Sequence, residues 1–333
     1  MTENIAVPPL RVACGSRQKF ENLLMACKGG ILGVLAYAAV EPDLPKEWFP
    51  CAWVALPVFG EDAWYEVWIS ALPVTVKSGA PLCLSRDGEI LFGSLVLDET
   101  GPAGLESKAF AAYSAIFDAI DNEGYPELLR VWNYFPRING AGRGLERYRE
   151  FNVGRHEAFS GKGRSIGEGS VPAACALGSR QGNLVVCFLA GKVPGLPIEN
   201  PRQTNAYHYP RDFGPRSPTF SRGMLVGGGL FISGTASIIG SETVHVEDVS
   251  RQLDETIENL RAVVDRARKC GFAATGLDEL FLNVYLRCAG DYSRVRSRLD
   301  AEFGGEAHIA YLQADVCRAD LLVEIEAFWI PSI

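Results

Sequence analysis

The chain closes with ADVCRADLLVEIEAFW, residues 314–329, in which aliphatic residues alternate with other residues before two aromatic ones. This alternation predicts a β-strand. In such a strand Val323 and Ile325 lie on one face, and Glu324 and Glu326 lie on the other. On this pattern alone we expect the two carboxylates to be solvated surface charges. If their face instead lines a cleft, one of them becomes a candidate proton donor with a raised pKa.

The segments before this strand follow a repeated pattern of strands and helices. Apolar residues at helical spacing predict helices at 105–122, 249–270 and 291–303. Alternating or continuous apolar runs predict strands at 52–56, 64–69, 89–96, 128–134, 184–189, 229–239 and 278–288. Between them, residues 136–169 and 202–222 are polar, rich in Arg, and contain no expected helix or strand. This pattern predicts that each half of the chain forms a mixed β-sheet with helices packed on one face. We therefore expect a duplicated α+β fold, with domains at 1–150 and 151–333.

Composition limits the classes of function. The chain has 333 residues, 47% of them hydrophobic, which excludes a disordered protein. Its formal net charge of −8 argues against non-specific binding to nucleic acid or to an anionic membrane. The longest apolar stretches, such as 30–40, are too short to span a bilayer. Residues 1–4 lack the basic region and apolar run of a signal peptide, so we expect a cytoplasmic protein.

The cysteines and histidines do not form a recognisable metal or disulfide pattern. There are nine cysteines, an odd number, without a C-x-x-C pair. The four histidines do not have the spacing of metal ligands. We therefore expect neither a disulfide framework nor a bound metal, and most of the cysteines should be buried small hydrophobic residues.

The second half resembles the RidA/YjgF fold at 232–238, 252–260, 283–286 and 323–327. In that family a sheet packs against two helices, and the sites lie in clefts between subunits. The resemblance implies that the chain consists of two RidA/YjgF-like halves. RidA proteins that hydrolyse imines carry an arginine shortly before the final strand. Ile309 occupies the corresponding position here, which speaks against imine deamination.

A more specific resemblance covers nearly the whole chain. Residues 130–139, 144–155 and 207–222 are similar to the chorismatases, which remove pyruvate from chorismate. Branches of that family form a dihydroxycyclohexadiene carboxylate, 3-hydroxybenzoate, or a mixture of 3- and 4-hydroxybenzoate, and the chain looks most like the last branch. The resemblance implies chorismate as the substrate and no metal or organic cofactor, and it leaves the oligomeric state open.

The substrate would carry two carboxylates into an acidic protein, so a basic pocket is required. The segments 136–169 and 202–222 supply arginines, whose planar guanidinium groups bind carboxylates in a two-pronged geometry. By composition alone these arginines are equally compatible with solvated loops that form salt bridges. The family resemblance implies substrate binding for a set of side chains that comprises Tyr148, Arg155, Tyr209, Arg222, Arg143 and Arg211.

The same resemblance implies that Glu324 is the general acid. The reaction needs a proton on the terminal methylene carbon of the enol ether, so the carboxyl must be protonated near neutral pH. Glu326 is expected to have a structural role or to act as a partner of Glu324. The combination of Cys317 with Gly234 resembles the one found in the hydroxybenzoate-forming branches. The resemblance implies that the small residue makes room and that the thiol steers the intermediate.

The spacing of Cys317 raises a question about the strand. Seven positions separate it from Glu324, which places the two side chains on opposite faces of a regular strand. Either a bulge lies between them, or Cys317 precedes the strand. Three other functions remain as alternatives: a RidA-like imine deaminase, a chorismate hydrolase that forms a dihydroxycyclohexadiene carboxylate, and a non-catalytic module that binds an acid of aromatic metabolism.

Overall fold

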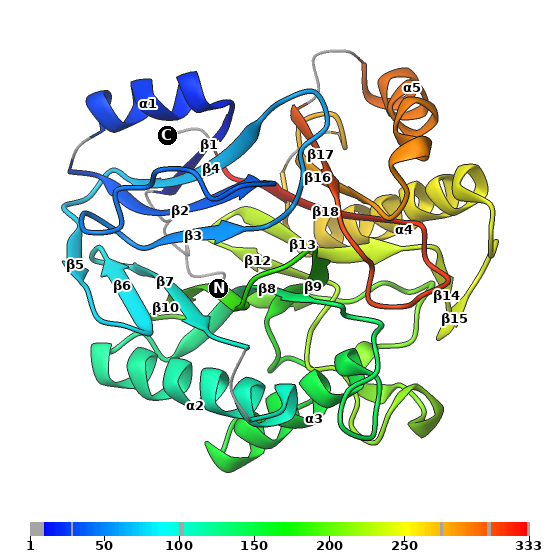
Figure 1. The fold of residues 1–333 in the computed structure, drawn as a ribbon, viewed down its shortest axis with the longest axis horizontal. Coiled ribbons are helices and arrows are strands. Elements are labelled where there is room, and N and C mark those ends of the chain that lie inside the picture. The colour runs from blue at the N-terminus through cyan, green and yellow to red at the C-terminus, as the bar shows by residue number, and fades with distance from the viewer. Residues whose placement is uncertain (1–9, 28, 100–102, 274–275, 305–307, 332–333) are drawn as a thin grey trace.

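The computed structural model describes residues 10–331 except 28, 100–102, 274–275 and 305–307. The N-terminal stretch considered for a signal peptide lies outside the described residues. Over the described residues the strands form one four-stranded, two six-stranded and one two-stranded sheet. Figure 1 shows the three larger sheets facing one another, with the helices on their outer sides. Within those residues, no helix has both the length and the apolar character needed to cross a bilayer.

The first sheet contains four strands in the order β1 (Leu10–Gly15), β4 (Ala63–Ser70), β2 (Ile31–Ala38) and β3 (Cys51–Val54). Helix α1 (Arg17–Ala26) covers the outer face of this sheet. Phe20 is the buried residue of α1, and its ring stacks on that of Tyr65 in β4 with centroids 4.3 Å apart. The strands expected at 52–56 and 64–69 are confirmed.

The middle sheet contains six strands in the order β5 (Thr75–Lys77), β6 (Leu82–Arg86), β7 (Ile90–Leu97), β10 (Leu184–Gly191), β8 (Glu127–Pro136) and β9 (Ala173–Ser179). Helices α2 (Leu105–Glu123) and α3 (Arg147–Gly161) pack together on its outer side. The helix expected at 105–122 is confirmed, whereas α3 lies in a segment where no helix was expected. Its buried residues include Arg147, Glu150 and Arg155, so an apolar stripe does not mark this helix.

The third sheet contains six strands in the order β11 (Leu196–Ile198), β12 (Gly223–Val226), β13 (Gly229–Ala236), β18 (Val323–Trp329), β16 (Phe281–Leu286) and β17 (His308–Gln313). Helices α4 (Val249–Lys269) and α5 (Tyr292–Phe303) cover its outer face, as expected. The smaller elements are β14 (Ile238–Ile239), β15 (Glu242–Thr243), η1 (Ala206–His208), η2 (Arg211–Phe213) and η3 (Ala289–Asp291). The strand expected over 314–329 begins only at Val323.

The two six-stranded sheets have the same topology. Counted along the chain, the first three strands of each sheet form an antiparallel meander. The sixth strand pairs with the third, and the fourth and fifth strands run parallel to each other. This confirms two α+β halves, each a mixed sheet with helices on one face. In the four-stranded sheet, β1, β2, β3 and β4 are arranged like the third, fourth, fifth and sixth strands of the larger sheets. Residues 10–70 therefore form a third, smaller unit of the same topology. The boundary expected between residues 150 and 151 falls inside α3.

The three units meet at a buried centre that the sequence did not indicate. Tyr37 in β2, Tyr134 in β8 and Tyr285 in β16 occupy equivalent positions in the three sheets. The hydroxyl of Tyr134 lies 3.0 Å from that of Tyr37 and 3.2 Å from that of Tyr285. On the last strand of each unit, the residues paired with these tyrosines are Trp64, Val185 and Glu324. An approximate threefold axis therefore passes close to the three hydroxyls.

Charged and polar side chains surround this axis. Glu326 forms an ion pair with Arg130 and accepts hydrogen bonds from Asn283 (2.9 Å) and Tyr285 (2.6 Å). Glu66 accepts hydrogen bonds from Asn283 (2.5 Å) and from Tyr37 (3.2 Å). Burial and the charge of Glu326 raise the pKa of Glu66 to about 8. Glu326 therefore belongs to a buried network in which a guanidinium balances one of two adjacent carboxyl groups.

Glu66→Gln should change how stability depends on pH. Because the folded-state pKa of Glu66 is raised, its proton stabilises the fold fully below the unfolded-state pKa, and this contribution declines as pH rises towards 8. Gln keeps an oxygen acceptor and does not titrate. We expect the free energy of unfolding of the variant, relative to that of the parent, to increase between pH 5 and 8 by up to about 1.4 kcal/mol per pH unit. Urea denaturation at four pH values measures this, and parallel curves would contradict it.

Candidate functional site

A cavity of about 250 Å³ opens between the middle and third sheets. Five chain segments contribute to it: the start of α3, residues 209–222, strand β13 with the residues after it, the start of β18, and the loop between β17 and β18. Figure 1 shows this last loop beside β14 and β15, on the side of the molecule that carries α4. The side chains with charged or reactive groups that line it are Glu146, Tyr148, Arg149, Tyr209, Arg222, Cys317, Arg318, Asp320 and Glu324.

Glu324 projects from β18 into this cavity and is only 3% exposed. The expectation of solvated carboxylates on this face is therefore wrong, because the face turns towards the middle sheet while Val323 and Ile325 pack in the core beneath the helices. Burial, reinforced by the nearby Glu326, raises the pKa of Glu324 to about 8. A carboxyl with this pKa is protonated at neutral pH and can donate a proton.

Gly234 lies directly against this carboxyl. It belongs to a break in the register between β13 and β18, where residues 233 and 234 have no partner in the pairing. A β-carbon at position 234 would overlap Oε1 of Glu324 and contact Cys175. A glycine is thus required at this bulge if the carboxyl is to keep its position.

Cys317 precedes β18, which settles the question raised by its spacing. The loop at 314–322 turns the thiol back towards the strand, and Sγ lies 4.0 Å from Oε2 of Glu324. Burial and the charge of Glu324 raise the pKa of this thiol to about 12. Cys317 is therefore a neutral, weakly polar group beside the acid.

Arg287 holds this loop in place, a role that the sequence did not indicate. Its guanidinium donates hydrogen bonds to the backbone carbonyls of Leu321 (2.8 Å), Arg318 (2.9 Å) and Val316 (3.1 Å). It also forms an ion pair with Asp315 at 2.7 Å. One side chain thereby fixes both ends of the segment that carries Cys317.

Arg222 and Tyr209, two residues of the predicted substrate-binding set, both line the cavity. Nη2 of Arg222 donates hydrogen bonds to the hydroxyl of Tyr209 (2.7 Å) and to the carbonyl of Thr204 (2.8 Å). Its guanidinium also lies over the rings of Phe220 (5.3 Å) and Tyr209 (5.7 Å). Nε of Arg222 is buried and has no hydrogen-bond partner within the described part of the chain. The wall therefore offers a desolvated cation with an unused donor.

Arg318 adds a second cation that the sequence analysis missed. Its guanidinium stacks over Phe213 (4.3 Å) and Tyr209 (5.2 Å), and Nη1 donates a hydrogen bond to the carbonyl of Ser241 (2.7 Å). Among the described residues, its Nη2 is buried without a partner. The available signal was its place beside Cys317, since the backbone at 317 brings both side chains to one cavity.

Tyr148 also lines the cavity and lies near Cys317. Burial, followed by the nearby thiol, raises the pKa of its hydroxyl, so the phenol remains a hydrogen-bond donor. Arg155 does not line the cavity. It lies buried in α3, where Nη2 donates a hydrogen bond to Asn152 (2.8 Å). Its charge nevertheless acts on Tyr148, because it lowers the pKa that burial raises.

The two remaining arginines of the predicted set are placed elsewhere. Arg143 and Arg211 are exposed and do not line the cavity. Arg149, one turn into α3, lines it instead and forms an ion pair with Glu146 at 3.6 Å. Ile309 lies on β17 outside this cavity. The structure thus brings together six of the nine predicted residues and adds two arginines.

Comparison with known proteins gives a consistent family. A family model described as chorismatase FkbO/Hyg5-like, N-terminal, matches residues 66–190. A 3-hydroxybenzoate synthase of Streptomyces hygroscopicus is 36% identical over 312 residues, which cover 89% of this chain and 90% of that protein. A chorismatase of Streptomyces rapamycinicus is 36% identical over 280 residues, 80% of this chain and 82% of that protein. A chorismatase crystal structure superposes with a TM-score of 0.87 at 32% identity and covers 98% of this chain and 100% of that one.

Proposed function

Because the chain belongs to the FkbO/Hyg5-like chorismatase family, we propose that it converts chorismate to a hydroxybenzoate and pyruvate in the cavity beside Glu324. The chain is an enzyme that acts on chorismate. The observation that carries the chemistry is a buried carboxyl, with its pKa raised to about 8, in a cavity that arginines also line. Chorismate rearranges to hydroxybenzoate plus pyruvate without a net gain or loss of water, so a dry cavity suffices.

Glu324 is the proton donor in this proposal. Its proton passes to the terminal methylene carbon of the enolpyruvyl group, and the ether carbon becomes an oxocarbenium centre. The carboxylate left behind is stabilised by Arg222, Arg130 and Arg287, each of which favours the charged form of Glu324. Burial holds the proton on the acid before the reaction, and these three cations lower the cost of releasing it.

Arg222 and Arg318 are suited to hold the substrate carboxylates. Each has an N–H group that is buried without a partner among the described residues, and both line the cavity. A buried, unpartnered guanidinium donor is costly, and a carboxylate would satisfy it with a charge-assisted hydrogen bond. Tyr209 bridges the two arginines, since it accepts a hydrogen bond from Arg222 and its ring lies 5.2 Å from the Arg318 guanidinium.

After protonation, the product depends on whether water or the neighbouring ring hydroxyl is the attacking group. If water adds to the oxocarbenium centre, the hemiketal loses pyruvate and a dihydroxycyclohexadiene carboxylate remains. If the neighbouring ring hydroxyl displaces the pyruvyl group, an epoxide forms and opens to a hydroxybenzoate. Cys317 lies 4.0 Å from the acid and offers a thiol where water could otherwise stand, which supports the second route. We also propose that the products are a mixture of 3- and 4-hydroxybenzoate.

Chromatography of the products formed from chorismate tests the function. We expect pyruvate and hydroxybenzoate in equal amounts. A diol in place of hydroxybenzoate would select the water route. Release of ammonia from an imine generated from an amino acid, without turnover of chorismate, would favour the RidA-like alternative. Tight binding of chorismate without turnover would indicate a binding module.

Cys317→Ala should change the product ratio more than the rate of pyruvate release. The thiol lies beside Glu324 but has its pKa raised to about 12, so it neither donates the first proton nor acts as a thiolate. Alanine leaves space for water next to the oxocarbenium centre. We expect a larger share of diol or of the minor hydroxybenzoate isomer at a pyruvate yield within about threefold of the parent. Cys187→Ala, a buried cysteine in β10 outside the cavity, is the matched control. An unaltered product ratio would contradict the steering role of Cys317.

A further inference from the structure

The threefold arrangement of the fold creates two further clefts that are related to the catalytic one. In each unit the residue paired with the central tyrosine points into a cavity. Glu324 lines the catalytic cavity between the middle and third sheets. Val185 lines a cavity of about 560 Å³ between the first and middle sheets. Trp64 lines a cavity of about 320 Å³ between the third and first sheets.

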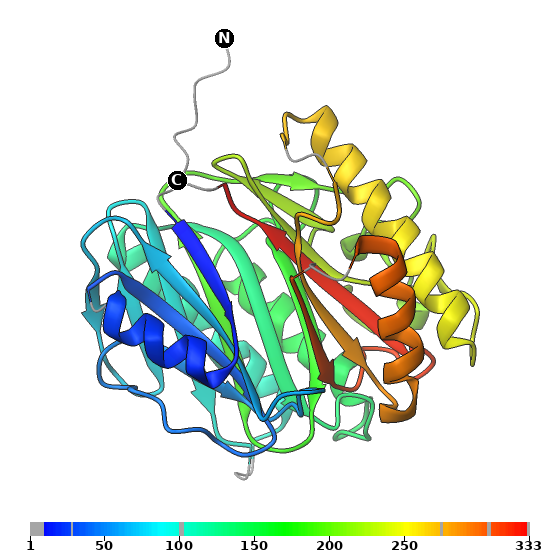
Figure 2. The ribbon, with the colours of Figure 1, turned by 90° about the horizontal axis from the view of Figure 1, so that it is seen from above.

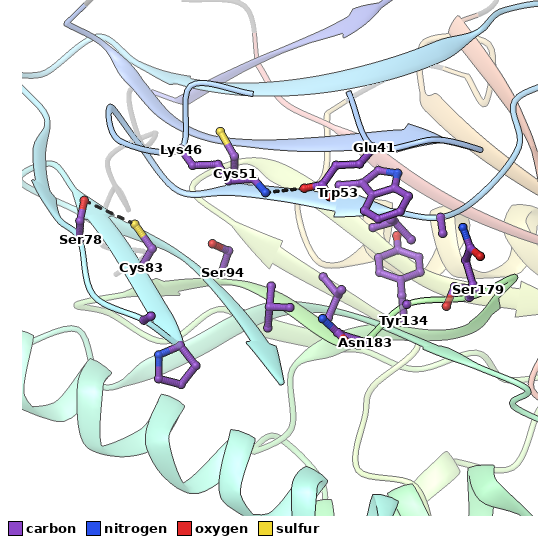
Figure 3. Close-up of a pocket in the computed structure, with 18 of the residues that line it drawn as sticks. Glu41, Lys46, Cys51, Trp53, Ser78, Cys83, Ser94, Tyr134, Ser179 and Asn183 are labelled. Atoms are coloured by element: carbon purple, nitrogen blue, oxygen red, sulfur yellow. Dashed lines mark hydrogen bonds and ion pairs between the residues drawn. The ribbon is translucent and has the colours of Figure 1, made fainter. Parts of the chain in front are cut away.

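The cavity at Val185 is large enough to hold a small molecule, and Figure 3 shows its residues. Trp53 and Tyr134 lie close together at one end, and Ser78 and Cys83 lie at the other. Val185 contributes to the apolar part of the wall. Its volume of about 560 Å³ lies in the ordinary range for small-molecule sites.

Its charged groups differ from those of the catalytic cavity. Val185 replaces the acid Glu324. Cys83 lies opposite Ser94 on β7, the position that corresponds to Arg222 opposite Ser233 in the third unit. The residue types that would hold a dianion and protonate it are therefore absent from these two positions. The cleft has the architecture of the catalytic one without its acid and without its buried arginine.

The two charged side chains that line this cavity within the described part of the chain neutralise each other. Lys46 and Glu41 form an ion pair, with exposed fractions of 56% and 46%, and Figure 3 shows them on the side of the first sheet. Arginine is not found among the described residues that line this cavity. A charged ligand would therefore lose water without gaining an available counter-charge.

One polar atom in this cavity lacks a partner. The hydroxyl of Ser179, at the end of β9, is buried and makes no hydrogen bond within the described residues. Asn183 and Ser94 contribute further polar side chains to the same cavity. A buried hydroxyl without a partner is uncommon in a folded protein and can be satisfied by a ligand that carries a hydrogen-bonding group.

We propose that the cavity at Val185 is a second, non-catalytic binding site for an uncharged, single-ring aromatic molecule that carries a hydroxyl or amide group. The aromatic ring would pack between Trp53 and the valine side of the wall, and the polar group would reach Ser179. The balanced ion pair explains why a neutral ligand is favoured over the carboxylates that the catalytic cavity binds.

The test uses 3-hydroxybenzamide as a neutral probe and 3-hydroxybenzoate as its charged counterpart. Binding is measured by isothermal titration calorimetry with the full chain, in the parent and in Glu324→Gln. We expect the neutral probe to bind at a site that is unchanged in Glu324→Gln, and to bind there at least tenfold more tightly than the carboxylate. A crystal soaked with the probe should show it beside Trp53 and Ser179. Absence of binding at millimolar concentrations, or loss of binding in Glu324→Gln, would overturn the proposal.

Three variants test the location. Val185→Trp copies the residue that occupies the equivalent position in the third cleft, and should weaken binding of the probe at least tenfold. Because Val185 is buried, Val96→Trp serves as a second blocking variant; Val96 lines the same cavity and is 37% exposed, so the larger ring can be accommodated without repacking the core. Ser179→Ala should weaken binding about threefold or more through the loss of one hydrogen bond. Unchanged affinity in a folded Val96→Trp would place the probe elsewhere and refute the site.

Discussion

Replacing Glu324 with Gln should lower the rate of pyruvate release from chorismate by at least ~10²-fold. The amide has nearly the same size and cannot transfer a proton to the methylene carbon, while the cavity and its arginines keep their places. Because Glu324 is buried with its pKa raised to about 8, it is protonated at neutral pH, and we expect it to supply the proton in the parent enzyme. Coupling pyruvate to lactate dehydrogenase gives kcat and KM, and chorismate affinity should change far less than kcat.

The pH profile identifies the acid independently. If the parent requires protonated Glu324, as proposed, kcat/KM should be constant below about pH 7 and fall above about pH 8, by tenfold per pH unit. The residual activity of Glu324→Gln should lack this decline. Glu66→Gln removes another buried carboxyl with a pKa of about 8 that does not line the cavity, and should retain the alkaline decline. Full turnover in Glu324→Gln would falsify the assignment.

Arg222→Met should have the second largest effect, and most of it should fall on substrate binding. The variant keeps an apolar stem against Phe220 and Tyr209 but loses the buried guanidinium. A charge-assisted hydrogen bond to a carboxylate contributes about 1.5–3 kcal/mol, so we expect KM for chorismate to rise by roughly 10- to 150-fold. The alkaline decline should also move to higher pH, because Arg222 favours the charged form of Glu324.

Two further variants separate charge from geometry. Arg222→Lys keeps the charge and should recover only part of the loss, since an ammonium lacks the planar two-pronged geometry. Arg251→Met removes an exposed arginine from the first turn of α4, and its kinetics should match those of the parent. If Arg222→Met left KM unchanged while Arg318→Met raised it, the carboxylate would bind at Arg318 alone.

The elements that the sequence predicted are those whose burial follows a simple period. Helix α4 has Leu253, Ile257 and Leu260 buried on one side, and its range agrees with the expectation to within one residue. Helix α3 escaped detection because Arg147 and Arg155, which are buried there, would ordinarily mark a solvated segment. Local periodicity carries information about apolar burial, and it carries none about charges that are buried against other charges.

For the site, family resemblance supplied what residue patterns could not. The alternation in the last strand placed Glu324 and Glu326 on one face, but it assigned that face to solvent, because the sheet that covers it comes from residues far away in the chain. Cys317, Gly234, Tyr148, Tyr209 and Arg222 meet at the same cavity from separate segments. Arg318 and Arg287 were missed, since only the folded loop shows which carbonyls and rings they contact.

The repeated sheets also bear on how such a cavity can arise. In an assembly of three identical chains, a substitution enters every interface at once, so an acid that benefits one junction is imposed on all three. Here a single polypeptide supplies all three junctions, and the same structural position holds a carboxyl at one, an isopropyl group at the next and an indole at the last. In a single polypeptide each junction can therefore differ from the others, and the proposed reaction needs an acid at only one of them.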